Sequence, residues 1–138
     1  MSIRQKTACL SLLSLLIVYG FYFREALAAR AAGAGLWDYV WLLVAAIVVS
    51  IIVEVVGAIV IAVTARGALD APMDERERMF DGRAMRVGYH VLFAGVMLVI
   101  ATALYGATRA DMVNAMVLAI CLSELARYAA FLSFHRAG

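Results

Sequence analysis

The chain has 138 residues, of which 66% are hydrophobic and only 16% are charged. Soluble domains carry about 25% charged residues, and a chain this short cannot bury so much apolar surface in one core. The composition therefore excludes an ordinary soluble domain and predicts one membrane domain over residues 1–138. The net charge of +2 is not gathered into a basic surface, so direct nucleic-acid binding is not expected.

Four segments are apolar enough to cross a membrane, which takes about 20 helical residues. We place the spans at about residues 7–23, 39–65, 87–108 and 112–134, with a polar loop at 66–86. Each span must be helical, because a single segment in lipid has no other way to satisfy its backbone hydrogen bonds. The sequence thus predicts an all-α, polytopic four-transmembrane-helix bundle.

The first span also has features of a secretory signal, since Arg4 and Lys6 precede an apolar run and Ala26-Leu27-Ala28 resembles a cleavage site. The run is long for a signal core, and Arg24 and Glu25 interrupt the approach to the site. We favour a retained span, with cleavage as the alternative.

Basic residues indicate the orientation, since cytoplasmic loops are enriched in lysine and arginine. Nine of the twelve lie on one side of the expected spans, namely Arg4, Lys6, Arg66, Arg76, Arg78, Arg83, Arg86, Arg127 and Arg136. The other three are Arg24, Arg30 and Arg109. This bias predicts that both termini and the 66–86 loop are cytoplasmic, and Trp37, Tyr39 and Trp41 then mark the outer interface.

The 66–86 loop contains the motif Asp74-Glu75-Arg76-Glu77-Arg78, in which Asp74 and Glu77 match a capping box. We expect a short interfacial helix that leads, past Gly82, into the third span. Such alternating charges fit a solvated helix face. They also fit a docking surface for a soluble cytoplasmic protein, made of Asp74, Glu75, Arg76, Glu77 and Arg78.

Ionisable side chains inside the spans predict an intramembrane polar cluster, because charges in lipid face the protein interior and find partners. Its expected members are Glu54, His90, Glu124, Arg127 and Tyr128. In one interpretation Glu124 pairs with Arg127, Glu54 is protonated or hydrogen-bonded to Tyr128 or His90, and the cluster sets helix register. In the other, Glu54 is a proton or cation site.

Cys9 and Cys121 lie in apolar runs at different expected depths, so we expect free thiols rather than a disulfide. His90 and His135 are the only histidines and no paired ligand motif occurs, so we expect no metal, haem or other cofactor. Glycine faces on the spans favour close helix packing and a homo-oligomer.

The motif from Asp74 to Glu77, the stretch from Arg86 to Leu92 and the stretch from Leu122 to Tyr128 resemble a known family. It comprises uncharacterised bacterial four-helix membrane proteins with a DERE or DERD cytoplasmic loop. The resemblance begins at about Pro72, and His90 departs from the aromatic or small residue expected at its position. It implies a multi-pass protein of the bacterial inner membrane, encoded by genes that often accompany a helix-turn-helix regulator.

Two functions follow as hypotheses. The first is a non-enzymatic anchor or sensor whose Asp74–Arg86 loop binds a soluble partner, such as a helix-turn-helix regulator; we find no catalytic constellation that would make the chain an enzyme. The alternative is a small proton- or cation-coupled transporter using Glu54. The stretch Ile52–Gly57 is superficially similar to the first helix of small multidrug transporters, although here the glutamate lies on the second span.

Overall fold

The computed structural model describes residues 3–64 and 75–137, with side chains placed as far as residue 135. These residues form four α-helices and confirm the all-α prediction. The helices are α1 (Ile3–Ala31), α2 (Leu36–Thr64), α3 (Glu75–Leu104) and α4 (Arg109–Ala137). All four are long and apolar enough to cross a membrane. At 29 or 30 residues each, they measure about 44 Å and exceed the roughly 30 Å hydrocarbon layer.

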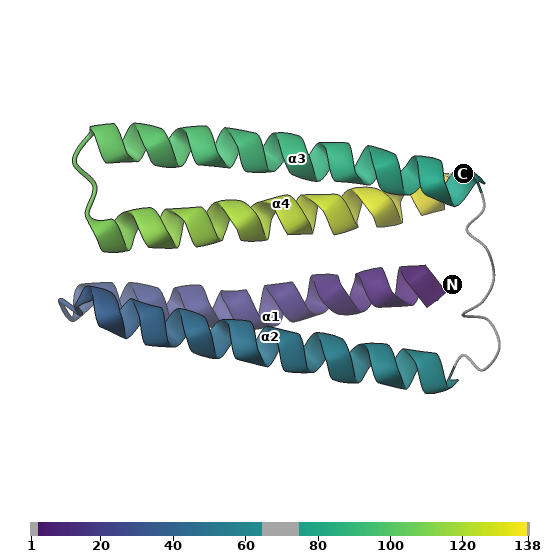
Figure 1. Ribbon diagram of the computed structural model, residues 1–138, viewed down its shortest axis with the longest axis horizontal. Helices are drawn as coiled ribbons and strands as arrows, with labels where there is room; N and C mark the ends of the chain where they lie inside the picture. Colours follow the sequence, from purple (N-terminus) through teal and green to yellow (C-terminus); the bar gives the residue numbers. More distant parts are fainter. Residues whose placement is uncertain (1–2, 65–74, 138) are drawn as a thin grey trace.

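The helices are arranged in the spatial order α2, α1, α4, α3 (Figure 1). α3 packs along α4, and α1 packs against both α2 and α4, whereas α1 and α3 make no close backbone approach within the described residues. The start of α1 and the end of α4 lie at the same end of the molecule, together with the C-terminal end of α2 and the N-terminal end of α3. We call this the terminal end and the opposite one the turn end.

Two tight turns close the turn end, and both are specified by the sequence. Gly33 and Gly106 adopt positive φ values of 73° and 81°, which glycine accepts without the steric penalty of a Cβ atom. The next helix then starts on a capping side chain. Asp38 accepts a 2.9 Å hydrogen bond from the Gly35 amide, and the Thr108 hydroxyl accepts one of 3.1 Å from the Asp111 amide.

α3 differs from the expectation at its N-terminal end. The segment from Glu75 to Arg86, expected to belong to the loop and to a separate short helix, forms the first turns of α3 itself. Gly82 does not interrupt it, since one glycine in a helix costs only about 1 kcal/mol relative to alanine. Glu75 and Glu77 in the first turn interact favourably with the helix dipole. The proposed cap, Asp74, lies outside the described residues.

Glycines bring the helices close together, as their spacing predicted. A Cβ atom added to Gly95 of α3 would lie 2.6 Å from the Ala119 Cβ of α4, and one added to Gly88 would lie 3.1 Å from the Ser123 carbonyl oxygen. Gly57 of α2 packs against the Leu10 side chain of α1. A side chain at Gly95 or Gly88 would push α3 away from α4, because the nearest atoms belong to Ala119 and to the Ser123 backbone, whereas at Gly57 the nearest atoms are the flexible end of Leu10.

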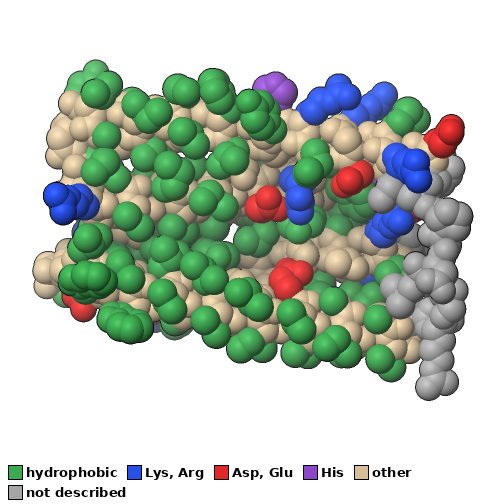
Figure 2. All heavy atoms as spheres, in the orientation of Figure 1, with side chains coloured by type: hydrophobic (Ala, Val, Ile, Leu, Met, Phe, Trp, Pro, Cys, Tyr) green, Lys and Arg blue, Asp and Glu red, His purple; other side chains and the backbone are tan. Residues whose placement is uncertain are grey.

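α2 is the most apolar helix and also the least covered. Its buried residues are Tyr39 and Ala46, while valine and isoleucine side chains are exposed along its length. Hydrophobic side chains likewise cover much of the face drawn in Figure 2, whereas charged ones gather toward the terminal end. Apolar surface of this extent is solvated by lipid rather than by water.

Candidate functional site

An apolar belt surrounds the middle of the molecule and ends at basic residues. On α1 no charge occurs between Lys6 and Arg24, a distance of about 27 Å along a helix. On α3 the belt starts after Arg86, and on α4 the same boundary lies at Arg127, whose side chain packs against Gly88. The belt is close in thickness to the hydrocarbon layer, about 30 Å.

Glu54 is the charged residue of α2 inside this belt, and Ser11 is its partner. The Ser11 hydroxyl donates a 2.8 Å hydrogen bond to the Glu54 carboxylate. Ser11 is only 3% exposed and lies about 7 Å further along α1 than Lys6. The predicted partners of Glu54 were Tyr128 or His90, so the sequence analysis missed Ser11.

A signal for Ser11 was present in the sequence. Thr7, Ser11 and Ser14 recur at spacings of four and three, which places them on one face of α1. Ser11 and Ser14 are both buried. Small hydroxyl side chains barely change the mean hydropathy of an apolar run, and for this reason the run looked uniform.

Glu124 and Arg127 form the predicted ion pair, with 3.0 Å between an Arg127 guanidinium nitrogen and a Glu124 oxygen. The guanidinium carbon also lies 4.6 Å from the centre of the Tyr128 ring, within the range of a cation–π interaction. A second guanidinium nitrogen reaches the Met85 sulfur at 3.5 Å. Arg127 therefore joins α3 to α4 at the boundary of the belt.

His90 lies apart from these groups, contrary to the prediction that it joins the cluster. Its side chain is exposed, its Nδ1 atom is 2.6 Å from the Arg86 carbonyl oxygen, and its ring contacts Tyr89 edge-on. Gly88 is buried against α4. His90 is two residues further on, about 200° around the helix, and so it faces outward.

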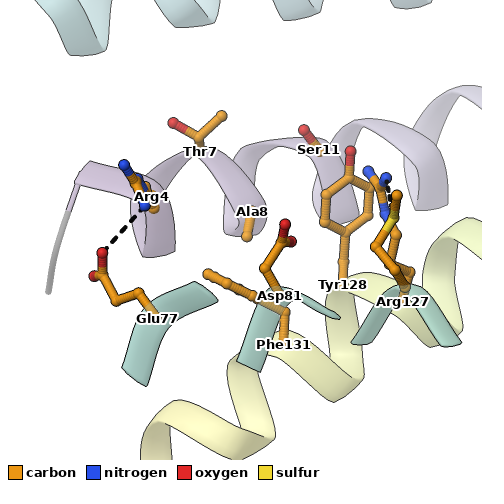
Figure 3. A pocket seen from close by; sticks show the side chains of 10 residues that line it. Arg4, Thr7, Ala8, Ser11, Glu77, Asp81, Arg127, Tyr128 and Phe131 are labelled. Carbon is orange, nitrogen blue, oxygen red and sulfur yellow. Dashed lines mark hydrogen bonds and ion pairs between the residues drawn. The ribbon is translucent and has the colours of Figure 1, made fainter. Parts of the chain in front are cut away.

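A pocket of about 300 Å³ opens at the terminal end between α1, α3 and α4 (Figure 3). We call it the terminal pocket. Its lining residues are Arg4, Thr7, Ala8, Ser11, Glu77, Asp81, Met85, Arg127, Tyr128 and Phe131. An Arg4–Glu77 ion pair of 3.2 Å spans it from α1 to α3. Since Ser11 lines the pocket, Glu54 is one hydrogen bond away from it.

The predicted docking residues have different surroundings. Glu75, Arg76 and Arg78 are exposed, and the Arg76 guanidinium lies 5.4 Å from the Phe80 ring centre. Glu77 instead faces α1, where it pairs with Arg4. The exposed part of the motif is therefore limited to its two arginines and Glu75 in the described residues.

Two polar contacts join α1 to α4 nearer the turn end, and neither was predicted. Tyr22, which is 0% exposed, donates a 2.6 Å hydrogen bond to the Asn114 side-chain oxygen. Arg30 pairs with Asp111 at 3.2 Å. The polar side chains of α1 and α4 thus meet along one seam, and buried Cys121 packs in the same core cluster as Tyr22.

The arrangement offers no obvious reactive group. Within residues 3–64 and 75–135, no cluster of three or more histidine, cysteine, aspartate or glutamate side chains could hold a metal ion. Cys9 and Cys121 are free thiols. What the site supplies is a charged pocket at the edge of an apolar belt and two carboxylates inside that belt, Glu124 paired with Arg127 and Glu54 bonded to Ser11.

Comparisons of the chain with protein-family models, with curated proteins and with solved structures give no match. The interpretation of function therefore depends on the residues and contacts described above.

Proposed function

We propose that this chain is a non-enzymatic anchor or sensor of the bacterial inner membrane, in which the α3 extension from Glu75 to Arg86 binds a soluble cytoplasmic protein. Its four helices form a transmembrane bundle with both termini in the cytoplasm. A helix-turn-helix regulator is the partner class that the family resemblance favours. The observation that carries the proposal is the continuity of α3 through its charged segment.

Helix length supports this proposal. The segment from Glu75 to Arg86 adds about 18 Å to α3 beyond the apolar belt. A headgroup layer is only about 5–8 Å thick on each side of the bilayer. The first turns of α3 would therefore extend past the lipid as a rigid helix, and a rigid charged surface loses little entropy when it binds.

The distribution of charge supports the orientation. At the terminal end the described basic residues are Arg4, Lys6, Arg76, Arg78, Arg83, Arg86 and Arg127, and at the turn end they are Arg24, Arg30 and Arg109. An excess of this kind marks the cytoplasmic side of inner-membrane proteins.

A charge-reversal pair tests the docking surface. Glu75→Lys with Arg76→Glu should abolish recovery of the partner when the full chain is gently solubilised from its native membrane and the proteins recovered with it are identified and quantified. The matched control is Arg24→Glu with Glu25→Lys, which reverses an equivalent adjacent pair at the turn end and should leave recovery unchanged. Equal recovery from both variants, with normal membrane insertion, would refute the docking proposal.

A second candidate function, proton- or cation-coupled transport, is favoured by the Ser11–Glu54 hydrogen bond. A carboxylate inside an apolar belt is a typical coupling group, and the terminal pocket leads to its serine partner. In liposomes that contain a trapped pH indicator, Glu54→Gln should stop proton movement and the control Glu25→Gln should not. Movement that persists in Glu54→Gln would eliminate this candidate.

A further inference from the structure

The terminal pocket presents unlike charges that the structure does not fully neutralise. Of its four charged lining residues, Arg4 and Glu77 neutralise each other. Arg127 of α4 is paired with Glu124, which does not line the pocket, so Asp81 of α3 is the lining charge without an ion-pair partner among the described residues. Figure 3 shows the Asp81 carboxylate pointing toward α1, between Ala8 and Tyr128.

Arg127 has donor capacity left for a ligand. One of its terminal nitrogens is bound to Glu124, and among the described residues the hydrogen-bond acceptor of the other is the Met85 thioether at 3.5 Å. A thioether sulfur is a weak acceptor, whereas a phosphate group matches the guanidinium fork and accepts charge-assisted hydrogen bonds. A phosphate that displaced Met85 would thus gain a strong donor.

Asp81 complements this cation. Its side chain is exposed to the pocket, and among the described residues it has no hydrogen-bond or ion-pair partner. An ionised carboxylate accepts hydrogen bonds and attracts cations. A primary ammonium group can donate up to three hydrogen bonds to it, which a quaternary ammonium cannot do.

The pocket also lies at the depth of lipid headgroups. Arg127 marks the boundary of the apolar belt, the α1 wall includes buried Ala8, and buried Phe131 lies one turn further along α4 than Arg127. α1 and α3 flank the pocket without packing on each other. A volume of about 300 Å³ is at the lower limit of small-molecule sites and suits a headgroup whose acyl chains continue along the belt.

We propose that the terminal pocket binds the zwitterionic headgroup of an amine-bearing phospholipid, with its phosphate on Arg127 and its primary ammonium on Asp81. The pocket lining carries two acidic and two basic residues, and Glu124 adds a third carboxylate beside Arg127, which disfavours an anionic headgroup and favours one that also brings an ammonium group to Asp81. This site goes beyond the docking function, and lipid binding is measured on the purified chain without any protein partner. Its failure would therefore leave the docking proposal intact.

Native mass spectrometry of the full chain in detergent, with one defined lipid added at a time, tests the proposal. Phosphatidylethanolamine should be retained about fivefold more than phosphatidylcholine or phosphatidylglycerol, the expected size for one partly exposed charge-assisted contact. Asp81→Asn should reduce the retention of phosphatidylethanolamine to that of phosphatidylcholine. Asp111→Asn, at the turn end, is the matched control and should retain the preference.

Two further arms complete the experiment. Arg127→Gln should weaken the binding of all three phospholipids. Arg127→Lys should restore part of that binding, which distinguishes loss of phosphate recognition from loss of folding. Free phosphoethanolamine is the competitor that identifies the source: weak competition supports a lipid, whereas competition equal to that of the lipid assigns the site to a soluble zwitterion and overturns the lipid proposal. Equal retention of the three lipids, or a preference unchanged in Asp81→Asn, would also overturn it.

Discussion

Ser11 of α1 donates a 2.8 Å hydrogen bond to Glu54 of α2, inside the apolar belt. This contact connects two helices that otherwise meet through apolar packing such as Gly57 against Leu10. Side-chain hydrogen bonds between transmembrane helices contribute about 0.6 kcal/mol on average and at most about 1.7 kcal/mol.

The first prediction is a measurable coupling between these two residues. A double-mutant cycle of Ser11→Ala and Glu54→Leu should give a coupling free energy of about 1 kcal/mol, measured by unfolding in detergent micelles. Ser50→Ala is the contrast, because the buried Ser50 hydroxyl has no hydrogen-bond partner within the part of the chain that the structure describes. That variant should be neutral or slightly stabilising, and zero coupling between Ser11 and Glu54 would contradict the contact.

The Tyr22–Asn114 contact leads to a second prediction. Tyr22→Phe removes the hydroxyl that donates the 2.6 Å bond and leaves the half-buried Asn114 oxygen without this donor, which should destabilise the protein by about 1 kcal/mol. Tyr105, which is 92% exposed, offers a matched control: Tyr105→Phe should leave the thermal unfolding midpoint unchanged. If both variants unfold at the same temperature, the buried bond does not stabilise the fold.

Alanine substitutions at two glycines of α3 should change the stability of the protein in opposite directions. Gly95→Ala places a methyl group 2.6 Å from the Ala119 Cβ and should destabilise α3 against α4 by about 1–3 kcal/mol. A Cβ atom added to Gly82 would have nothing within 4 Å, so Gly82→Ala should stabilise the helix by about 0.5–1 kcal/mol. Chemical denaturation of the two variants checks both signs, and a stable Gly95→Ala protein would exclude the close α3–α4 packing.

The proposed orientation can be tested by labelling. Arg78→Cys and Arg109→Cys place exposed thiols at the terminal end and the turn end. With a membrane-impermeant maleimide added to intact spheroplasts, we expect Arg109→Cys to react and Arg78→Cys to react only after permeabilisation. The parent chain, with buried Cys121 and half-buried Cys9, provides the background. The reverse pattern would place both termini outside the cytoplasm.

A homo-oligomer remains a prediction. The glycine faces that favoured it are already packed inside a single chain. Gly57, Gly88 and Gly95, whose faces favoured association, pack against Leu10, Arg127 and Ala119 of the same chain. Among the exposed apolar surfaces of the described helices, the face of α2 is the one we expect to bind a second copy, because α2 is the least covered helix. Native mass spectrometry should show a dimer or larger assembly that Val48→Trp disrupts, whereas a monomer in several mild detergents would refute the prediction.

The spacing of residues along one helix was sufficient to predict one contact of the site. The Glu124–Arg127 pair was predictable because residues three apart are neighbours on any helix, whatever surrounds it. The partner of Glu54 was not, since it depends on which helix lies beside α2. The prediction for His90 was wrong for a related reason. Its position along α3 indicates its expected depth in the membrane, but not the direction in which its ring points.

The amino-acid sequence by itself determined that this protein has four long apolar helices and how the charges divide between the two ends, because each depends on local composition. Only the tertiary structure decided that α1 lies between α2 and α4, that Ser11 meets Glu54 and that α1, α3 and α4 enclose the terminal pocket. The physical reason is that lipid solvates every apolar helix face almost equally. Helix rotation and neighbours are therefore selected by close packing of small residues and by a few polar contacts.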